Sequence, residues 1–154
     1  MPMDWRNPMH ILASGFGNGL APRAPGTFGT LAAIPIVLLL QLLLGGLYAG
    51  VIVLMFVAGI FICGRAARDW GVGDHPAIVW DEIVGLLVTM SLAPPGAVWL
   101  IAGFVLFRLF DIVKPWPICS VDRRVHGGFG IMLDDVIAGV FAAAILYLCV
   151  RWLS

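Results

Sequence analysis

The sequence predicts an all-α membrane protein, a multi-pass bundle of about five transmembrane helices that forms one domain over residues 1–154. Hydrophobic residues make up 61% of the chain and charged residues 12%, whereas soluble domains average about 45–50% and about 25%. The mean hydropathy is +1.01. In addition, residues 24–64 contain no charged side chain. These observations indicate that lipid surrounds most of the folded chain.

The uncharged stretch at residues 24–64 predicts two crossings. As a single helix it would be about 60 Å long, twice the roughly 30 Å of one hydrocarbon core. We place the break at Gly45-Gly46, between apolar runs at residues 30–44 and 47–63.

The N-terminal segment is not expected to cross the membrane. Residues 1–23 contain Asp4, Arg6 and several glycines but no apolar run, so a signal peptide is not predicted. Residues 9–25 are moderately apolar, and either a surface helix with a loop or a re-entrant segment fits them.

The later apolar stretches need their charged flanks to complete a crossing. Residues 83–107 are interrupted by Ala-Pro-Pro-Gly at 93–96, a strong turn signal. Each half has about eleven uncharged residues where a crossing needs about 20. The halves form either a re-entrant hairpin or, as we favour, longer helices that bring their charged ends to the membrane surface. The last stretch, 136–150, likewise needs the acidic pair before it, and Gly139 predicts close helix contact.

The distribution of charge predicts the orientation. This topology places Arg151 on one side of the membrane. The other eight basic residues and all nine acidic residues lie on the opposite side of the membrane. By the positive-inside rule the charged side is cytoplasmic. The net charge is zero and no basic run occurs, so no nucleic-acid partner is expected.

Three acidic clusters lie at predicted cytoplasmic helix ends: Asp81-Glu82, Asp111 and Asp134-Asp135. Helix capping would explain one acid at a helix start. It explains adjacent pairs poorly, and it does not explain an acid at a helix C-terminus. Oxygen ligands without paired His or Cys favour Mg²⁺, whereas three scattered histidines do not suit zinc.

Basic side chains accompany these acids. Arg108 is three residues before Asp111, and Lys114 follows one turn later. Asp122 and His126 would share a helix face, with Arg123 between them. Carboxylates that hold a metal, with cations that fit phosphate oxygens, are typical of phosphoryl transfer. Arg123 and Arg124 are equally well explained as charges that fix the topology.

Other phosphatase and transferase mechanisms lack their signatures. No Cys-x₅-Arg loop, no Asp-x-Asp, no Ser-Gly-His and no Asp-x-x-Asp-Gly segment occurs. The residues leave metal-assisted attack by water as the expected chemistry. An ion or proton pathway is the alternative class, although the predicted outer half offers few polar groups for one. A non-catalytic assembly subunit would leave the acids unexplained.

Four ordered motifs resemble those of the phosphatidylglycerophosphatase A family. They are GFGNGLAPRAPGTFGTLAAIP at residues 15–35, IVWDEIVG at 78–85, FRLFDIVKPWP at 107–117 and DRRVHGGFGIMLDDVIAGV at 122–140. The resemblance implies a bacterial inner-membrane enzyme. It implies Mg²⁺-dependent hydrolysis of a phospholipid substrate, phosphatidylglycerophosphate, to phosphatidylglycerol and phosphate.

The residues and the resemblance together give a candidate site. Asp81, Glu82, Asp134 and Asp135 are the expected Mg²⁺ ligands, and Lys114, Arg123 and Arg108 the expected phosphate ligands. Catalytic roles are expected for Asp81, Asp111, His126 and Asp134, with His126 as the acid for the leaving group. Thr27 and Asp122 are weaker candidates for substrate binding.

Overall fold

The structure is a computed structural model that describes residues 3–153, and over that range it contains helices and no strand. The all-α prediction is therefore confirmed for these residues. Seven α-helices and one 3₁₀ helix follow in chain order: α1 (Pro8–Ala13), η1 (Asn18–Leu20), α2 (Pro25–Leu40), α3 (Gly45–Trp70), α4 (Trp80–Met90), α5 (Ala97–Val113), α6 (Ile118–Arg124) and α7 (Gly127–Leu153).

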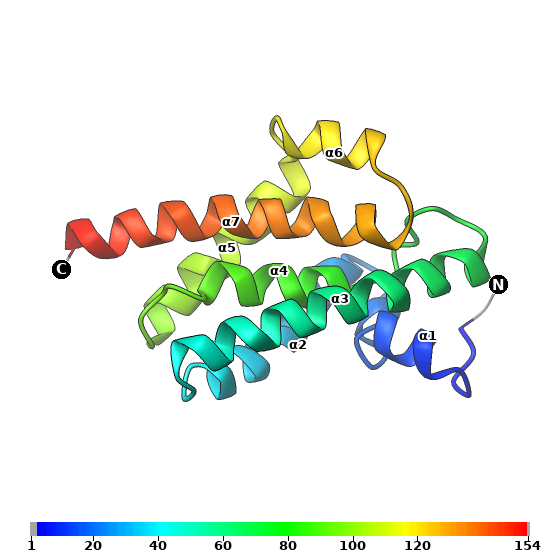
Figure 1. Cartoon of the computed structure of the whole chain (residues 1–154), viewed down its shortest axis with the longest axis horizontal. Coiled ribbons are helices and arrows are strands. Elements are labelled where there is room, and N and C mark those ends of the chain that lie inside the picture. Colours follow the sequence, from blue (N-terminus) through cyan, green and yellow to red (C-terminus); the bar gives the residue numbers. More distant parts are fainter. Residues whose placement is uncertain (1–2, 154) are drawn as a thin grey trace.

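Five helices run lengthwise and alternate in direction between the same two ends of the molecule (Figure 1). They are α2, α3, α4, α5 and α7. The short helices α1 and α6, together with the loop at residues 71–79, lie toward one end, which we call the α1/α6 end. The starts of α2, α4 and α7 and the ends of α3 and α5 all point toward it. The predicted acidic and basic residues are therefore gathered in one half of the bundle.

The helix at the centre is α4. It packs against α2, α3, α5 and α7, and Val84, Leu86 and Leu87 along it are fully buried. It has only 11 residues, which at 1.5 Å per residue is about 16 Å, roughly half of a hydrocarbon core. Burial by neighbouring helices, rather than its own length, therefore explains its position.

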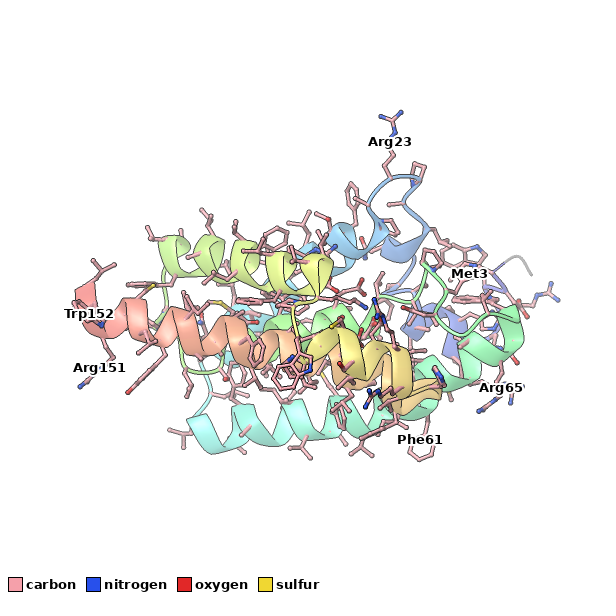
Figure 2. The ribbon with its side chains drawn as sticks, turned by 90° about the horizontal axis from the view of Figure 1, so that it is seen from above. Met3, Arg23, Phe61, Arg65, Arg151 and Trp152 are labelled. Atoms are coloured by element: carbon pink, nitrogen blue, oxygen red, sulfur yellow. The ribbon has the colours of Figure 1, made fainter. Side chains whose placement is uncertain are left out.

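Two helices, α3 and α7, are long and apolar enough to cross a membrane. Only 22% of the most apolar part of α3 and 28% of that of α7 is buried within the protein. Exposed apolar side chains such as Leu54 and Phe61 cover the remainder, and Figure 2 shows Phe61 pointing away from the bundle. This surface is consistent with a membrane protein.

One predicted break is displaced. Helix α2 ends at Leu40, residues 41–44 form the turn, and Gly45-Gly46 opens α3 instead of separating the two helices. The backbone N–H groups of Leu42 and Leu43 donate to carbonyls three residues earlier and close the end of α2. The turn is rich in exposed leucine, so hydropathy alone could not separate it from the helix. The turn at 93–96 lies between α4 and α5 as predicted.

The start of the last helix is also earlier than predicted. Helix α7 begins at Gly127, so Asp134-Asp135 lies about two turns inside it. The early start is possible because Gly128 passes directly against α3, where an added Cβ would lie 1.8 Å from the Ile60 carbonyl oxygen. Residues 9–24 lie in α1, η1 and turns, and Pro25 begins α2. His10 is buried beside α3.

Candidate active site

Three carboxylates from two helices meet near the α1/α6 end. Asp81 and Glu82 lie in the first turn of α4, and Asp135 lies on α7. One oxygen of each falls within 4.8 Å of the others. The helices come this close because Gly139 of α7 faces Gly85 of α4, where an added Cβ would be 2.6 Å from the Gly85 carbonyl oxygen. The predicted role of Gly139 in close helix contact is confirmed.

The same three carboxylates have oxygens that nothing in the described residues satisfies. Asp81 Oδ1, Glu82 Oε2 and Asp135 Oδ2 are buried and have no hydrogen-bond partner. Asp81 and Asp135 are 6% and 3% exposed. A buried carboxylate without a partner is costly, and oxygen ligands of this kind suit a hard divalent cation. The cluster therefore fits the Mg²⁺ that the sequence predicts.

The acids line a cavity of about 280 Å³. Its walls come from the start of α2, the loop at 71–79, the start of α4, the end of α5 and α7. Its ionisable lining residues are Asp74, His75, Asp81, Glu82, Arg108, Asp111, Lys114, Asp134 and Asp135. Gly26 forms part of the wall, and an added Cβ there would lie 2.3 Å from Glu82 Oε1. Glycine at the start of α2 thus leaves room for the Glu82 carboxylate.

Arg108 is held against the wall of this cavity by two acids. Its guanidinium pairs with Asp111, one turn later on α5, and lies 3.9 Å from Glu82 Oε1. The predicted pairing of Arg108 and Asp111 along one helix face is confirmed. The buried Nε of Arg108 has no partner among the described residues, so one donor of this cavity-lining side chain is unsatisfied.

Lys114 connects three helices. It follows α5 in the left-handed conformation, with φ 46°. Its Nζ donates to Asp122 Oδ1 of α6 at 2.8 Å and to Asp134 Oδ2 of α7 at 2.7 Å. Burial lowers the pKa of Lys114, but the two hydrogen bonds to carboxylates outweigh it and hold the pKa above its ordinary value. The ammonium is therefore charged at physiological pH.

The two neighbouring acids of α7 have different partners. Asp135 joins the three-carboxylate cluster, whereas Asp134 accepts from Lys114. Of the four residues predicted to hold the metal, three therefore converge in the structure. The fourth, Asp134, forms an ion pair beside them.

A second cavity, of about 240 Å³, adjoins the first and shares Asp74 and Asp134 with it. His126 and Asp122 line this second cavity and not the first. Asp122 and His126 would share a helix face only if the helix continued through both residues, and it does not. Helix α6 ends at Arg124, and Val125 adopts an extended conformation with φ −103° and ψ 120°.

Two predicted residues line neither of these cavities. Arg123 is exposed on α6, and Thr27 is half-buried in the first turn of α2. Among residues 3–153, Arg123 makes no ion pair. Its position agrees with the alternative that it contributes positive charge near the membrane surface.

Sequence reasoning missed Asp74, which lines both cavities. Partial burial of its carboxyl raises the pKa of Asp74, and the nearby Lys114 ammonium opposes that rise. The signal was a lone Asp-His pair in a glycine- and proline-rich loop, at residues 71–76, on the side where the other acids gather. Loops of this kind often contribute functional residues.

The family model for phosphatidylglycerophosphatase A matches residues 11–150, which include every residue of both cavities. The chain belongs to this family. A phosphatidylglycerophosphatase A of Escherichia coli strain K12 is 51% identical over 142 residues, covering 92% of this chain and 83% of that protein. One from Haemophilus influenzae is 43% identical over 149 residues, covering 96% of this chain and 91% of that protein. No solved structure matches the chain.

Proposed function

We propose that this protein is a lipid phosphatase that hydrolyses phosphatidylglycerophosphate to phosphatidylglycerol and inorganic phosphate. Its family and its two relatives named for this reaction support the substrate. The observation that carries the proposal is the cluster of unpartnered carboxylates beside Arg108 and Lys114 in one cavity. Metal-binding oxygens next to phosphate-binding cations are the requirements of metal-assisted phosphoryl transfer.

Asp81, Glu82 and Asp135 would hold Mg²⁺. The cavity lining has six carboxylates but only two permanently charged cations, Arg108 and Lys114. This excess of negative charge would repel a phosphate group, and one or two divalent ions would offset it. When bound, Mg²⁺ supplies Lewis-acid activation of the phosphate and of the attacking water.

The remaining residues orient the substrate. Arg108 offers its free Nε to a phosphate oxygen, while Asp111 fixes the guanidinium. Lys114 supplies a second positive charge, positioned by Asp122 and Asp134. His126, which lines the adjoining cavity, is the proposed acid for the leaving glycerol oxygen.

We further propose that α2, α3, α5 and α7 cross a bacterial inner membrane and that the short helix α4, enclosed by them, completes a fifth pass together with the turn that follows it. The active site would lie on the cytoplasmic side. Figure 2 supports this orientation, because Arg151 lies at the end opposite Arg23 and Arg65. An ion or proton pathway has less support. The polar groups of Tyr48 and Thr89, distant from the acids along α3 and α4, are hydrogen-bonded to backbone carbonyls.

Phosphate release by the purified protein in detergent tests the proposal. With phosphatidylglycerophosphate and Mg²⁺ we expect release that excess chelator abolishes and renewed Mg²⁺ restores. An Asp81→Asn variant with an unchanged thermal unfolding profile should release none. Absence of release by folded wild-type protein would exclude the substrate, and release unaffected by chelator would exclude the metal.

A further inference from the structure

A continuous apolar stripe on the outer face of α5 ends at the active-site cavity. Val98, Ile101, Val105, Leu109 and Ile112 recur every three or four residues, and their exposed fractions range from 52% to 74%. Ile112, the last of them, is 68% exposed and also lines the cavity. One side chain therefore belongs both to the apolar outer surface and to the cavity wall.

Exposed apolar side chains also follow the part of the cavity wall that α2 supplies. Gly26 of α2 lines the cavity. Phe28 and Leu31, directly after it on α2, are 47% and 43% exposed. Helices α2 and α5 both pack against α4. Helix α5 and the start of α2 both lie on the side opposite α3 in Figure 2. Apolar surface thus leads toward the same cavity on two helices that both pack against α4.

This arrangement distinguishes a lipid from a soluble substrate. A soluble phosphomonoester needs only an opening to water, and an apolar rim gives it nothing to bind. A diacyl lipid must keep its chains in hydrocarbon while its head group reaches the carboxylates. An opening beside exposed Ile112, with Phe28 and Leu31 on the outer surface of nearby α2, permits both. The apolar rim is therefore matched to the tails of the substrate.

We propose that Ile112, Phe28 and Leu31 form a lateral entrance through which the head group of a diacyl lipid phosphomonoester enters the cavity, with an acyl chain along the α5 stripe. The inference rests on the proposed function and adds the route and the recognition of the tails. Ile112 acts as a specificity residue for the diacyl portion and takes no part in the hydrolysis.

Photo-crosslinking tests the entrance without requiring turnover. Full-length protein in phosphatidylcholine vesicles would be irradiated with phosphatidylglycerophosphate that has a diazirine near the start of one acyl chain. We expect labelling around residues 109–112 and 28–31 that excess unlabelled substrate removes. Labelling around Phe61 on α3 should not be removed. Competition that leaves the α5 and α2 labelling unchanged would overturn the entrance, whereas competed labelling without phosphate release would count against the proposed function alone.

A matched pair of variants gives a second readout. Ile112→Gln places an amide at the entrance, and Phe61→Gln places one at a position of equal exposure, 68%, on α3. Ile112→Gln should lower kcat/KM for the long-chain lipid about tenfold, the effect of losing one apolar side-chain contact. It should change hydrolysis of the deacylated, water-soluble head group less than twofold, and Phe61→Gln should change neither. Equal loss on both substrates, or no loss on the lipid, would overturn the role of Ile112.

Discussion

Asp134 and Asp135 are adjacent on α7 but have different surroundings. Helical geometry turns consecutive side chains by about 100°. Asp135 therefore points to Asp81 and Glu82 of α4, while Asp134 points to Lys114 after α5. One acidic dipeptide thus supplies both a proposed metal ligand and the anchor of a cation.

Replacing Asp135 by Asn should separate metal binding from folding. The amide keeps the side chain's size but removes the charge that would hold Mg²⁺. We expect kcat/KM to fall by about 10²–10³-fold, a typical loss for one electrostatic contact in a transition state. Activity against Mg²⁺ concentration would be measured, with Asp4→Asn, an exposed acid, as the control. Wild-type activity and Mg²⁺ dependence in Asp135→Asn would contradict its assignment as a ligand.

Removing the ammonium of Lys114 should destabilise the protein. Lys114→Met leaves the buried carboxylate of Asp134 without its partner, at a cost of about 1–3 kcal/mol. Because the Lys114 side chain is 26% exposed, solvent screening favours the lower part of this range. Thermal unfolding in detergent would measure it. Adding Asp134→Asn to Lys114→Met should recover stability, and a further loss in the double variant would show that the two side chains are not coupled.

The raised pKa of Asp74 predicts a pH-dependent stability effect. The pKa of the Asp74 carboxyl is higher in the folded protein than in the unfolded chain, so the folded protein binds this proton more tightly. Its ionisation therefore lowers stability as the pH rises above the unfolded-state value, and it contributes nothing at lower pH. Asp74→Asn should raise the unfolding temperature at pH 7 and leave it unchanged at pH 3. These temperatures would be measured with chelator present, and a lowered value at pH 7 would contradict the sign.

At the scale of elements, the contact between α3 and α7 depends on the absence of a side chain at Gly128. An added Cβ would lie 1.8 Å from the Ile60 carbonyl oxygen. Gly128→Ala must therefore push the two helices apart, at a cost of about 1–3 kcal/mol for overpacking. The matched control is Gly50→Ala, where the added Cβ meets nothing within 4 Å. Gly50→Ala should preserve or raise the unfolding temperature, and equal effects of the two substitutions would contradict the packing.

The elements also show what the sequence could and could not predict. The gap in charged residues predicted two helices, α2 and α3, and the Pro-Pro-Gly turn separated α4 from α5, because these signals are local. The exposed leucines at residues 42–44 concealed the end of α2. The start of α7 at Gly127 depends on its approach to α3, which is a tertiary contact. Gly139 showed the tendency to close contact but could not identify α4 as its partner.

In the candidate site, too, local sequence signals could be read and tertiary contacts could not. Paired acids at apolar boundaries identified Asp81, Glu82 and Asp135, because a buried charge in such a sequence is rare and needs a reason. The sequence pattern could not show that Lys114 pairs with Asp134. Lys114 follows α5 and Asp134 lies in α7, so the pair forms only when these helices pack together. The loop residue Asp74 lay outside every periodic segment, so only its position in space revealed it.

At the scale of the whole molecule, the alternating helices predict opposite accessibility of their ends. In a variant without Cys63, Cys119 and Cys149, single cysteines would be introduced as Arg124→Cys on α6 and Arg151→Cys near the end of α7. A membrane-impermeant maleimide applied to intact cells should label position 151 and spare position 124. Inside-out vesicles should give the reverse. Labelling of both positions from one side would contradict the proposed topology.

The burial of α4 also has a consequence for synthesis. Its 11 residues begin with two acids, so on its own it is a poor candidate for insertion into a bilayer. Four helices pack around α4, and α7 is the last of them to be synthesised. Helix α4 is therefore fully covered only after α7 has left the ribosome. Asp135 arrives on that same helix. A nascent chain therefore has an unprotected central helix and no complete set of carboxylates until α7 is in place, and the final insertion step assembles the site and completes the fold together.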